Sequence, residues 1–375
     1  MILFNKPSVT DIERKLITEA LSSGKLCGDG GFTKKASNML SERLNIPVPL
    51  LTTSCSHALD MSAMLLDLKP GDEVIMPSFT FVSTANAVVL RGAKPVFAEI
   101  DSSTLNMDPD AVEPLITGKT KAVFTVHYAG ASCDMDKLTD ICKSHNLPLV
   151  EDAAQTVGST YKGRQLGAIG QLGAFSFHET KNYVMGEGGA LIISDEKYRA
   201  QAEIIREKGT NRSRFIRGEI DKYTWQDVGS SYLPSDVLAA MLCGQLERFD
   251  EIMNKRMAVW NHYHKALKEF EDKELLQRHA VNPDCNHNAH MYYFLAPTPE
   301  KRNQLLQKMK AGGVMAIFHY IPLHTSAVGE SLGYKPGNLP ITENCASRLI
   351  RLPLYADITE QELDKVIEVL TDSIK

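Results

Sequence analysis

Residues 147–152 read LPLVED and residues 172–182 read LGAFSFHETKN, and these two stretches decide the fold. Each begins as a short apolar run and ends in polar side chains, with Asp152 closing the first run and Ser176 near the end of the second. Short apolar runs of this kind are typical of strands buried in a parallel sheet. Lys181 stands three residues after His178, so three polar groups lie close to two predicted strand ends.

The sequence on both sides of these stretches alternates between strand-like and helix-like segments from about residue 50 to residue 195. Strands are predicted at 73–77, 95–100, 121–127, 148–152, 173–177 and 190–194. Helices are predicted at 56–66, 83–90 and 135–145. This alternation predicts an α/β fold with a mostly parallel central sheet and helices on both of its faces.

The pattern changes after about residue 236. A long helical pattern covers 236–270, and the chain from there to residue 375 has a mixed α/β character. We therefore predict a large domain over residues 1–240, which includes the N-terminal segment, and a smaller C-terminal α/β domain over residues 241–375.

Composition narrows the class of protein. The net charge of -5 argues against broad nucleic-acid binding, which requires a basic face. The seven cysteines are scattered without metal-finger spacing, which is typical of a reducing compartment. No apolar run approaches the roughly 18 residues that cross a bilayer. We expect a cytoplasmic enzyme or binding protein with neither a nucleic-acid nor a membrane partner.

The polar residues at the strand ends suit pyridoxal 5'-phosphate (PLP), because ligands of open α/β sheets bind outside the carboxyl ends of the strands. PLP needs a lysine for a Schiff base, here Lys181, and an acid against its ring nitrogen, here Asp152. Its phosphate is best held at a helix N-terminus, and residues 52–57 (TTSCSH) precede a predicted helix. Phe81 follows another strand end and could stack on the ring.

Each of these residues also has a simpler explanation. A lysine after a strand is usually a solvated surface residue, an aspartate there is usually a turn residue, and Ser-Cys-Ser before a helix is usually a cap. The ordered set favours the cofactor, because Asp152 and Lys181 lie 29 positions apart on successive predicted strands.

Four motifs together resemble the DegT/DnrJ/EryC1/StrS family of sugar aminotransferases: TSCSHA at 53–58, PSFTFVSTAN at 77–86, VEDAAQ at 150–155 and FSFHETKN at 175–182. The resemblance covers nearly the whole chain. It implies the fold type I architecture of PLP-dependent transferases, which is that of aspartate aminotransferase. It also implies a homodimer with shared active sites and pyridoxamine phosphate as an intermediate.

The resemblance implies a role for each residue around the cofactor ring. Lys181 forms the Schiff base and later shuttles protons, and Asp152 pairs with the pyridine nitrogen. Gln155 lies near the ring hydroxyl, and Phe81 stacks on the ring face.

The resemblance also implies how the phosphate is held. Cys55 and Ser56 donate backbone N–H groups, and Ser176 adds its hydroxyl. Ser231 stands where many members have an asparagine that reaches the phosphate from the other subunit, so its shorter side chain is expected to reach less well or through water.

Six further segments resemble the members that aminate dTDP-4-keto-6-deoxy-D-glucose at C4: 23–33, 126–130, 205–213, 222–225, 229–233 and 318–324. The implied reaction is a ping-pong transfer from L-glutamate that gives dTDP-4-amino-4,6-dideoxy-D-galactose for surface polysaccharide, as in enterobacterial common antigen. The gluco epimer and other nucleotide-4-keto-sugars remain open, because the proton can reach either face of C4.

Four residues are candidates for contact with this nucleotide sugar, each with a plainer alternative. Gly30, in the glycine loop at 28–31, would allow close approach to the sugar or simply form a turn. Arg212 belongs to a basic run that would meet the diphosphate or remain a solvated face. His319 and Tyr320 would close over the substrate or serve the core. A metal site is disfavoured, because no third ligand stands at a fitting spacing.

Two other functions compete with the aminotransferase. A pyridoxamine-phosphate-dependent sugar 3-dehydratase has histidine in place of the Schiff-base lysine, so Lys181 argues against it. A regulatory or binding protein without catalysis would not need Asp152, Gln155 and Ser176 beside that lysine.

Overall fold

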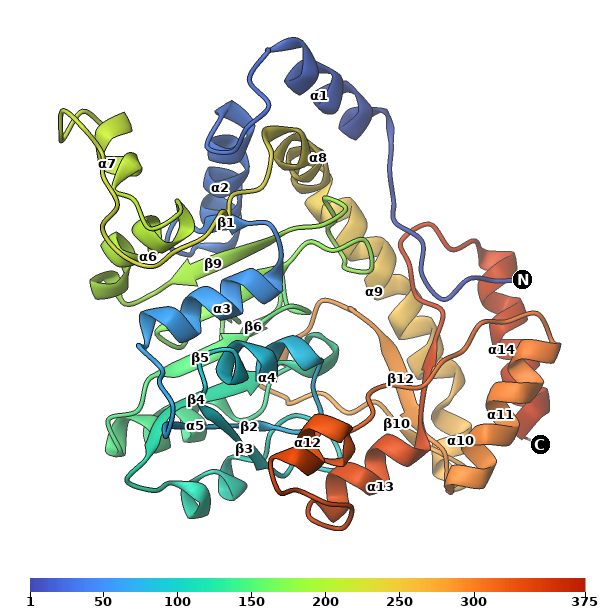
Figure 1. Ribbon diagram of the computed structural model, residues 1–375. Helices are drawn as coiled ribbons and strands as arrows, with labels where there is room; N and C mark the ends of the chain where they lie inside the picture. The colour runs from blue at the N-terminus through green and yellow to red at the C-terminus, as the bar shows by residue number, and fades with distance from the viewer. Residues whose placement is uncertain (375) are drawn as a thin grey trace.

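A seven-stranded sheet forms the centre of the computed structural model, which describes residues 1–374 (Figure 1). Its strand order is β1-β9-β8-β5-β4-β2-β3. The strands are β1 (Leu50–Thr52), β2 (Glu73–Pro77), β3 (Lys94–Ala98), β4 (Thr120–Val126), β5 (Leu149–Asp152), β8 (Leu172–Ser176) and β9 (Gly189–Ile193). Strand β9 alone runs opposite to the other six strands, so the prediction of a mostly parallel sheet is confirmed.

Helices cover both faces of this sheet because apolar side chains alternate along its strands. Leu191 and Ile193 of β9 face one side, in a core with α3 (Cys55–Leu65), α4 (Val82–Val89) and α6 (Arg199–Arg206). Ala190 and Ile192 face the other side, in a core with α2 (Gly31–Leu44) and α8 (Asp236–Glu247). Helix α5 (Met135–Ser144) covers that second side beside β2 and β4.

The six predicted strands are all present and begin within one residue of the predicted positions. The predicted helix over 236–270 is instead three helices: α8, α9 (Phe249–Ala266) and α10 (Lys268–Asp272). Arg248 separates the first two with φ -103° and ψ 19°, and its guanidinium pairs with Glu13 and Glu251. An apolar pattern continues through such a break, because each helix still buries one face.

A second core lies in the C-terminal part of the chain. The antiparallel strands β10 (Gln277–Arg278), β12 (Tyr292–Leu295) and β13 (Leu349–Leu352) form a small sheet. This sheet packs with α9, α11 (Pro299–Ala311) and α14 (Glu360–Ile374). Ile252 of α9 belongs to the core of the large sheet and Val259 to the second core. The boundary at residue 240 stays a prediction, and we propose that the packing changes within α9.

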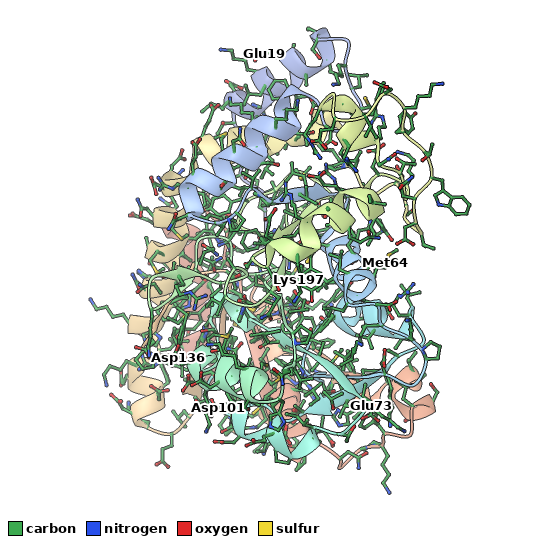
Figure 2. All side chains as sticks on the ribbon, turned by 90° about the vertical axis from the view of Figure 1, so that its left-hand side faces the viewer. Glu19, Met64, Glu73, Asp101, Asp136 and Lys197 are labelled. Carbon is green, nitrogen blue, oxygen red and sulfur yellow. The ribbon has the colours of Figure 1, made fainter. Side chains whose placement is uncertain are left out.

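The other α-helices and strands pack around these cores, and α1 (Asp11–Ser22) adds Leu16 and Ala20 to the core that contains α2 and α8. These other elements are α1, α7 (Arg212–Ile216), α12 (Ala327–Ser331), α13 (Pro340–Arg348) and the three short strands β6 (Thr160–Tyr161), β7 (Arg164–Gln165) and β11 (Cys285–Asn286). Figure 2 shows Glu19 of α1 at one end of the molecule and Glu73 of β2 at the other. Among residues 1–374, no helix combines the length and apolarity needed to cross a membrane.

Candidate active site

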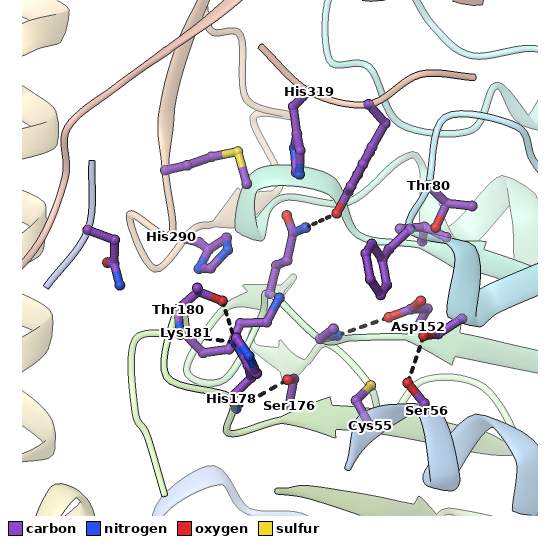
Figure 3. Close-up of a pocket in the computed structure, with 18 of the residues that line it drawn as sticks. Cys55, Ser56, Thr80, Asp152, Ser176, His178, Thr180, Lys181, His290 and His319 are labelled. Carbon is purple, nitrogen blue, oxygen red and sulfur yellow. Dashed lines mark hydrogen bonds between the residues drawn. The ribbon is translucent and has the colours of Figure 1, made fainter. Parts of the chain in front are cut away.

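A cavity of about 580 Å³ opens beyond the carboxyl ends of β5 and β8 (Figure 3). The large sheet supplies one wall and β13 with its neighbours supplies another. Nine of the predicted site residues line it: Cys55, Ser56, Phe81, Asp152, Gln155, Ser176, Lys181, His319 and Tyr320. Figure 3 shows Cys55 and Ser56 on one side of the cavity and Lys181 on the other.

The N-terminus of α3 forms the anion-binding end of the cavity. Ser54 caps this helix, because its Oγ accepts a hydrogen bond from the backbone N–H of His57 at 3.1 Å. The N–H groups of Cys55 and Ser56, in the first turn, have no acceptor within the helix and suit a phosphate. The glycine at 189 allows this approach, since a Cβ there would lie 2.4 Å from the Cys55 nitrogen.

The Asp152 carboxylate is held by a hydroxyl from α4 and by a backbone N–H two residues along its own segment. The Thr84 hydroxyl on α4 donates to Oδ2 at 2.6 Å, and the backbone N–H of Ala154 donates to Oδ1 at 3.2 Å. The Thr84 hydroxyl also bonds to that of Thr80 at 2.8 Å, which fixes its direction. Sequence reasoning missed Thr84, although it lies in the motif at 77–86 that also contains Phe81.

Gln155 joins the sheet to the segment that contains Tyr320. Its Oε1 accepts from the backbone N–H of Ala129 at 2.6 Å, and its Nε2 donates to the Tyr320 hydroxyl at 3.2 Å. Burial raises the pKa of Tyr320, which keeps its phenol protonated. The Tyr128 hydroxyl bonds to His319 Nδ1 at 3.2 Å, so His319 and Tyr320, which both line the cavity, are each held by a hydrogen bond from outside their own segment.

Lys181 lies in an environment that favours its neutral amine. Burial lowers the pKa of Lys181, the negative charge of Asp152 opposes that shift, and the positive charge of Arg351 adds to it. A lower amine pKa increases the fraction of neutral, nucleophilic lysine at physiological pH. This is the state that attacks the aldehyde of a carbonyl cofactor.

His290 is a cavity residue that sequence reasoning missed. Its Nδ1 bonds to the Asn182 side chain at 2.9 Å, so the residue next to Lys181 orients it. Burial lowers the pKa of His290 well below its usual range, and the charge of Lys181 acts in the same direction. No local pattern could have identified it, because it enters the cavity from the segment just before β12.

The other three predicted residues do not line the cavity within one chain. Ser231 is exposed in a backbone bridge with Glu207, and Arg212 pairs with Glu207 at 3.2 Å. Gly30 begins α2 against Asp236, whose carboxylate lies 2.2 Å from where a Cβ would be. Their roles toward cofactor and substrate stay predictions.

The cavity residues fit PLP by the chemistry of their side chains. Free N–H groups at α3 suit a phosphate, an oriented carboxylate suits a pyridinium nitrogen, and a lysine with a lowered pKa suits an aldehyde. Phe81 is 56% exposed at the start of α4, so its ring face is available for stacking. These groups belong to separate elements that converge on one cavity.

Comparisons with known proteins agree with this chemistry. A model of the DegT/DnrJ/EryC1/StrS aminotransferase family matches residues 7–371. The spore coat polysaccharide biosynthesis protein SpsC of Bacillus subtilis is 32% identical over 99% of this chain and 97% of its own length.

Solved structures are similar over the full chain. The aminotransferase TlmJ of Streptoalloteichus hindustanus has a TM-score of 0.92 at 29% identity and covers 100% of this chain and 99% of its own. The candidate sugar aminotransferase Spr1654 of Streptococcus pneumoniae has been solved in a PLP form, with a TM-score of 0.91 at 27% identity over 100% of this chain and 98% of its own. Its PMP form has a TM-score of 0.92 at 26% identity over 100% of this chain and 99% of its own.

Proposed function

The chain belongs to the DegT/DnrJ/EryC1/StrS aminotransferase family, and we propose that this PLP-dependent enzyme transfers the amino group of L-glutamate to C4 of dTDP-4-keto-6-deoxy-D-glucose. The product is dTDP-4-amino-4,6-dideoxy-D-galactose, a precursor of surface polysaccharide such as enterobacterial common antigen. Segments 23–33, 205–213 and 318–324 resemble those of family members that aminate this sugar, and this resemblance supports the choice of substrate.

The meeting of Lys181 and Asp152 in one cavity is the observation that supports transamination most directly. PLP, when bound, supplies an electron sink for the carbanion at the donor's α-carbon. Lys181 Nζ takes the proton from that carbon in the first half of the reaction and gives a proton to C4 of the sugar in the second. Its lowered pKa suits the neutral base that the first half requires.

The sugar ring is proposed to contact Tyr320 and His319. Their polar atoms are already oriented by Gln155 and Tyr128, so they can bond to sugar hydroxyls without a large rearrangement.

A homodimer with shared active sites is the proposed assembly. The segment from 210 to 232 exposes several large apolar side chains, and a contiguous exposed apolar patch is a typical interaction surface. These side chains are Phe215, Ile216, Tyr223, Trp225 and Val228. Ser231 and Arg212 lie on the same segment, so a second copy could present them to the phosphate groups of its partner's ligands.

We also propose a cytoplasmic location. The seven cysteines, all within the described chain, are free thiols, and thiols persist in a reducing compartment.

The experiment that tests the substrate combines turnover with product analysis. The enzyme should convert dTDP-4-keto-6-deoxy-D-glucose and L-glutamate to an amino sugar whose C4 nitrogen is axial by NMR. An equatorial nitrogen would establish the gluco epimer instead. Failure to consume this sugar, while L-glutamate still changes the visible absorbance of the cofactor, would reject the sugar but keep the aminotransferase.

Replacement of Lys181 tests the catalytic assignment. Lys181→Ala should reduce turnover below detection, because the first proton transfer loses its base and the second its acid. L-glutamate should then no longer change the cofactor's visible absorbance on the timescale of turnover. Lys310→Ala, at an exposed position on α11, is the matched control and should retain wild-type turnover.

A further inference from the structure

Ser78, His324 and Glu343 form a hydrogen-bonded network at the end of the segment that contains His319 and Tyr320. The Ser78 Oγ lies 2.7 Å from His324 Nδ1 and accepts the backbone N–H of His324 at 3.0 Å. On the other side of the ring, His324 Nε2 lies 2.8 Å from Glu343 Oε1. Because Ser78 directly follows β2 and Glu343 lies on α13, the network joins the large sheet to the C-terminal part of the chain.

One placement of protons satisfies all three side chains. Burial raises the pKa of Glu343, but hydrogen bonds from His324 and from the backbone N–H groups of Gly337 and Leu339 bring it below its usual 4.5. An ionised carboxylate only accepts, so His324 Nε2 carries a hydrogen and Nδ1 accepts from the Ser78 hydroxyl. Ser78 and His324 are both fully buried, so no substrate can reach this serine as it would reach a catalytic nucleophile.

The segment that ends in this network has no regular structure of its own. Residues 318–322 belong to neither a helix nor a strand. Ser78 holds the end of the segment through three hydrogen bonds, two with His324 and one from the Leu323 N–H to its own carbonyl at 3.0 Å. A segment without a backbone ladder depends on such contacts for its conformation, so Ser78 and His324 fix the path of the chain at residues 318–322.

Ser78 also stands at the start of the motif that contains Phe81. The ring of the next residue, Phe79, meets the edge of the Tyr320 ring with the centroids 5.6 Å apart. The Tyr320 ring lies 6.4 Å from that of Phe81. One buried serine therefore supports two walls of the cavity, the wall proposed for ring stacking and the wall proposed for the sugar.

We propose that Ser78 and His324 are positioning residues for the acceptor sugar, which hold His319 and Tyr320 where their polar atoms meet it. Neither Ser78 nor His324 lines the cavity, so both act through the segment between them and the sugar. In a ping-pong transfer the amino donor reacts first, so the two half-reactions can be measured separately. The proposal rests on the proposed function.

Hydrogen–deuterium exchange of the PLP-loaded enzyme tests the network itself. Ser78→Ala removes the acceptor of the His324 N–H and the donor to its ring, so peptides covering 318–325 should exchange at least roughly tenfold faster. Peptides from α11 should exchange as in the wild type. Ser159→Ala is the matched control, because Ser159 is fully buried and its Oγ has no hydrogen-bond partner among residues 1–374. Unchanged exchange at 318–325 in Ser78→Ala would overturn the proposal.

Single-turnover kinetics tests the effect on the sugar. In Ser78→Ala, the dTDP-4-keto-6-deoxy-D-glucose concentration that half-saturates the second half-reaction should rise roughly tenfold, while that of L-glutamate in the first stays within about twofold. Glu343→Ala should act in the same direction, and Glu343→Gln, which keeps an acceptor for His324 Nε2–H, should lose less.

Equal losses toward both substrates would indicate a general defect of the fold and contradict a role in positioning the sugar. An unchanged response to the sugar, despite faster exchange at 318–325, would contradict it as well. A wild type that does not consume this sugar would instead reject the proposed substrate, while the exchange measurement still decides whether the network holds the segment. If Ser78→Ala fails to fold, Glu343→Ala serves in both experiments.

Discussion

The Thr84 hydroxyl presents the Asp152 carboxylate to the cavity, at a distance of 2.6 Å from Oδ2. Thr84→Val keeps the shape of the side chain but removes a hydrogen bond to a charged group, which contributes about 1.5–3 kcal/mol. We expect kcat/KM to fall by roughly 10- to 100-fold, as measured by steady-state kinetics, because the ring nitrogen loses a fixed partner.

Thr125→Val is the matched control for this substitution. Thr125 is equally buried, and its hydroxyl has only the sulfur of Cys133 nearby, at 4.0 Å. Wild-type kinetics in Thr84→Val, with folding intact, would show that Asp152 needs no such support.

For single residues, the sequence predicts the site side chains that follow strand ends. It does not predict the side chains that other elements bring into the site. Asp152 and Lys181 could be identified because Asp152 ends an apolar run and Lys181 follows the next run after only three polar residues. His290 and Arg351 could not, since they enter the cavity from the second core. Thr84 could not either, since it reaches Asp152 from α4. Chain distance conceals such neighbours, because only the packing of the elements brings them together.

Strand β9 and the start of α3 meet so closely that only glycine fits at residue 189. In Gly189→Ala the new Cβ would lie 2.4 Å from both the Cys55 nitrogen and the Ser54 carbonyl carbon, so backbone must move. We expect PLP affinity to fall at least roughly tenfold, because the N–H groups proposed for the phosphate are displaced. Equilibrium dialysis followed by absorbance measures this loss.

Gly118→Ala controls for the loss of a glycine as such, since a Cβ there meets nothing within 4 Å. Wild-type PLP affinity in Gly189→Ala would mean that the phosphate is held elsewhere.

Glu151 fixes the turn beneath the active-site strand. Its buried carboxylate accepts hydrogen bonds from His127 Nε2 at 2.7 Å and from the backbone N–H groups of Gly167, Ile169 and Gly170 at 2.7, 2.6 and 2.6 Å. Glu151→Gln replaces one acceptor oxygen by a donor, so we expect a loss of about 3–5 kcal/mol in the free energy of unfolding at neutral pH, measured by urea denaturation.

The same carboxylate predicts how stability depends on pH. Burial raises the pKa of Glu151, but the hydrogen bonds from His127, Gly170 and Gly167 together lower it below its usual 4.5. A carboxylate whose pKa is depressed by folding stabilises the protein above the unfolded pKa and loses that effect as pH falls through the folded pKa. The wild type should lose stability below about pH 4.5. Glu151→Gln should show a flatter curve there, and parallel curves would contradict this account.

The positions of the strands along the chain could be predicted from the sequence, but their directions within the sheet could not. Apolar alternation located β2, β4 and β8 closely, yet it is the same for either strand direction, so the reversal of β9 could not be predicted. Strand β1 is three buried residues long, which is too short for a periodic pattern.

For the molecule as a whole, the exposed apolar side chains of the segment from 210 to 232 predict a homodimer. Figure 1 shows α7 projecting from the body of the protein. Trp225 in this segment is 79% exposed. The wild type should have twice the 41.5 kDa mass of one chain in analytical ultracentrifugation. Trp225→Asp should shift it toward the monomer, because a charge at the centre of an apolar contact is costly.

Weakened PLP retention should accompany that shift if Ser231 acts across the dimer. Val328→Asp, at a 57% exposed position on α12, is the control and should leave the mass unchanged. A wild type that sediments as a monomer would reject shared active sites.

The pairing of β1 with β9 also has a consequence for the nascent chain during synthesis. Leu51 lies opposite Ala190, so the end of the cavity that is proposed to hold the phosphate is built from two strands that are far apart along the chain, β1 and β9. At about 5–20 residues per second, a ribosome makes the second strand roughly 7–28 s after the first. Until then the N-terminus of α3 lacks its partner strand. The cofactor can therefore be captured only late in synthesis, and a truncated chain that ends before residue 189 should leave the ribosome without it.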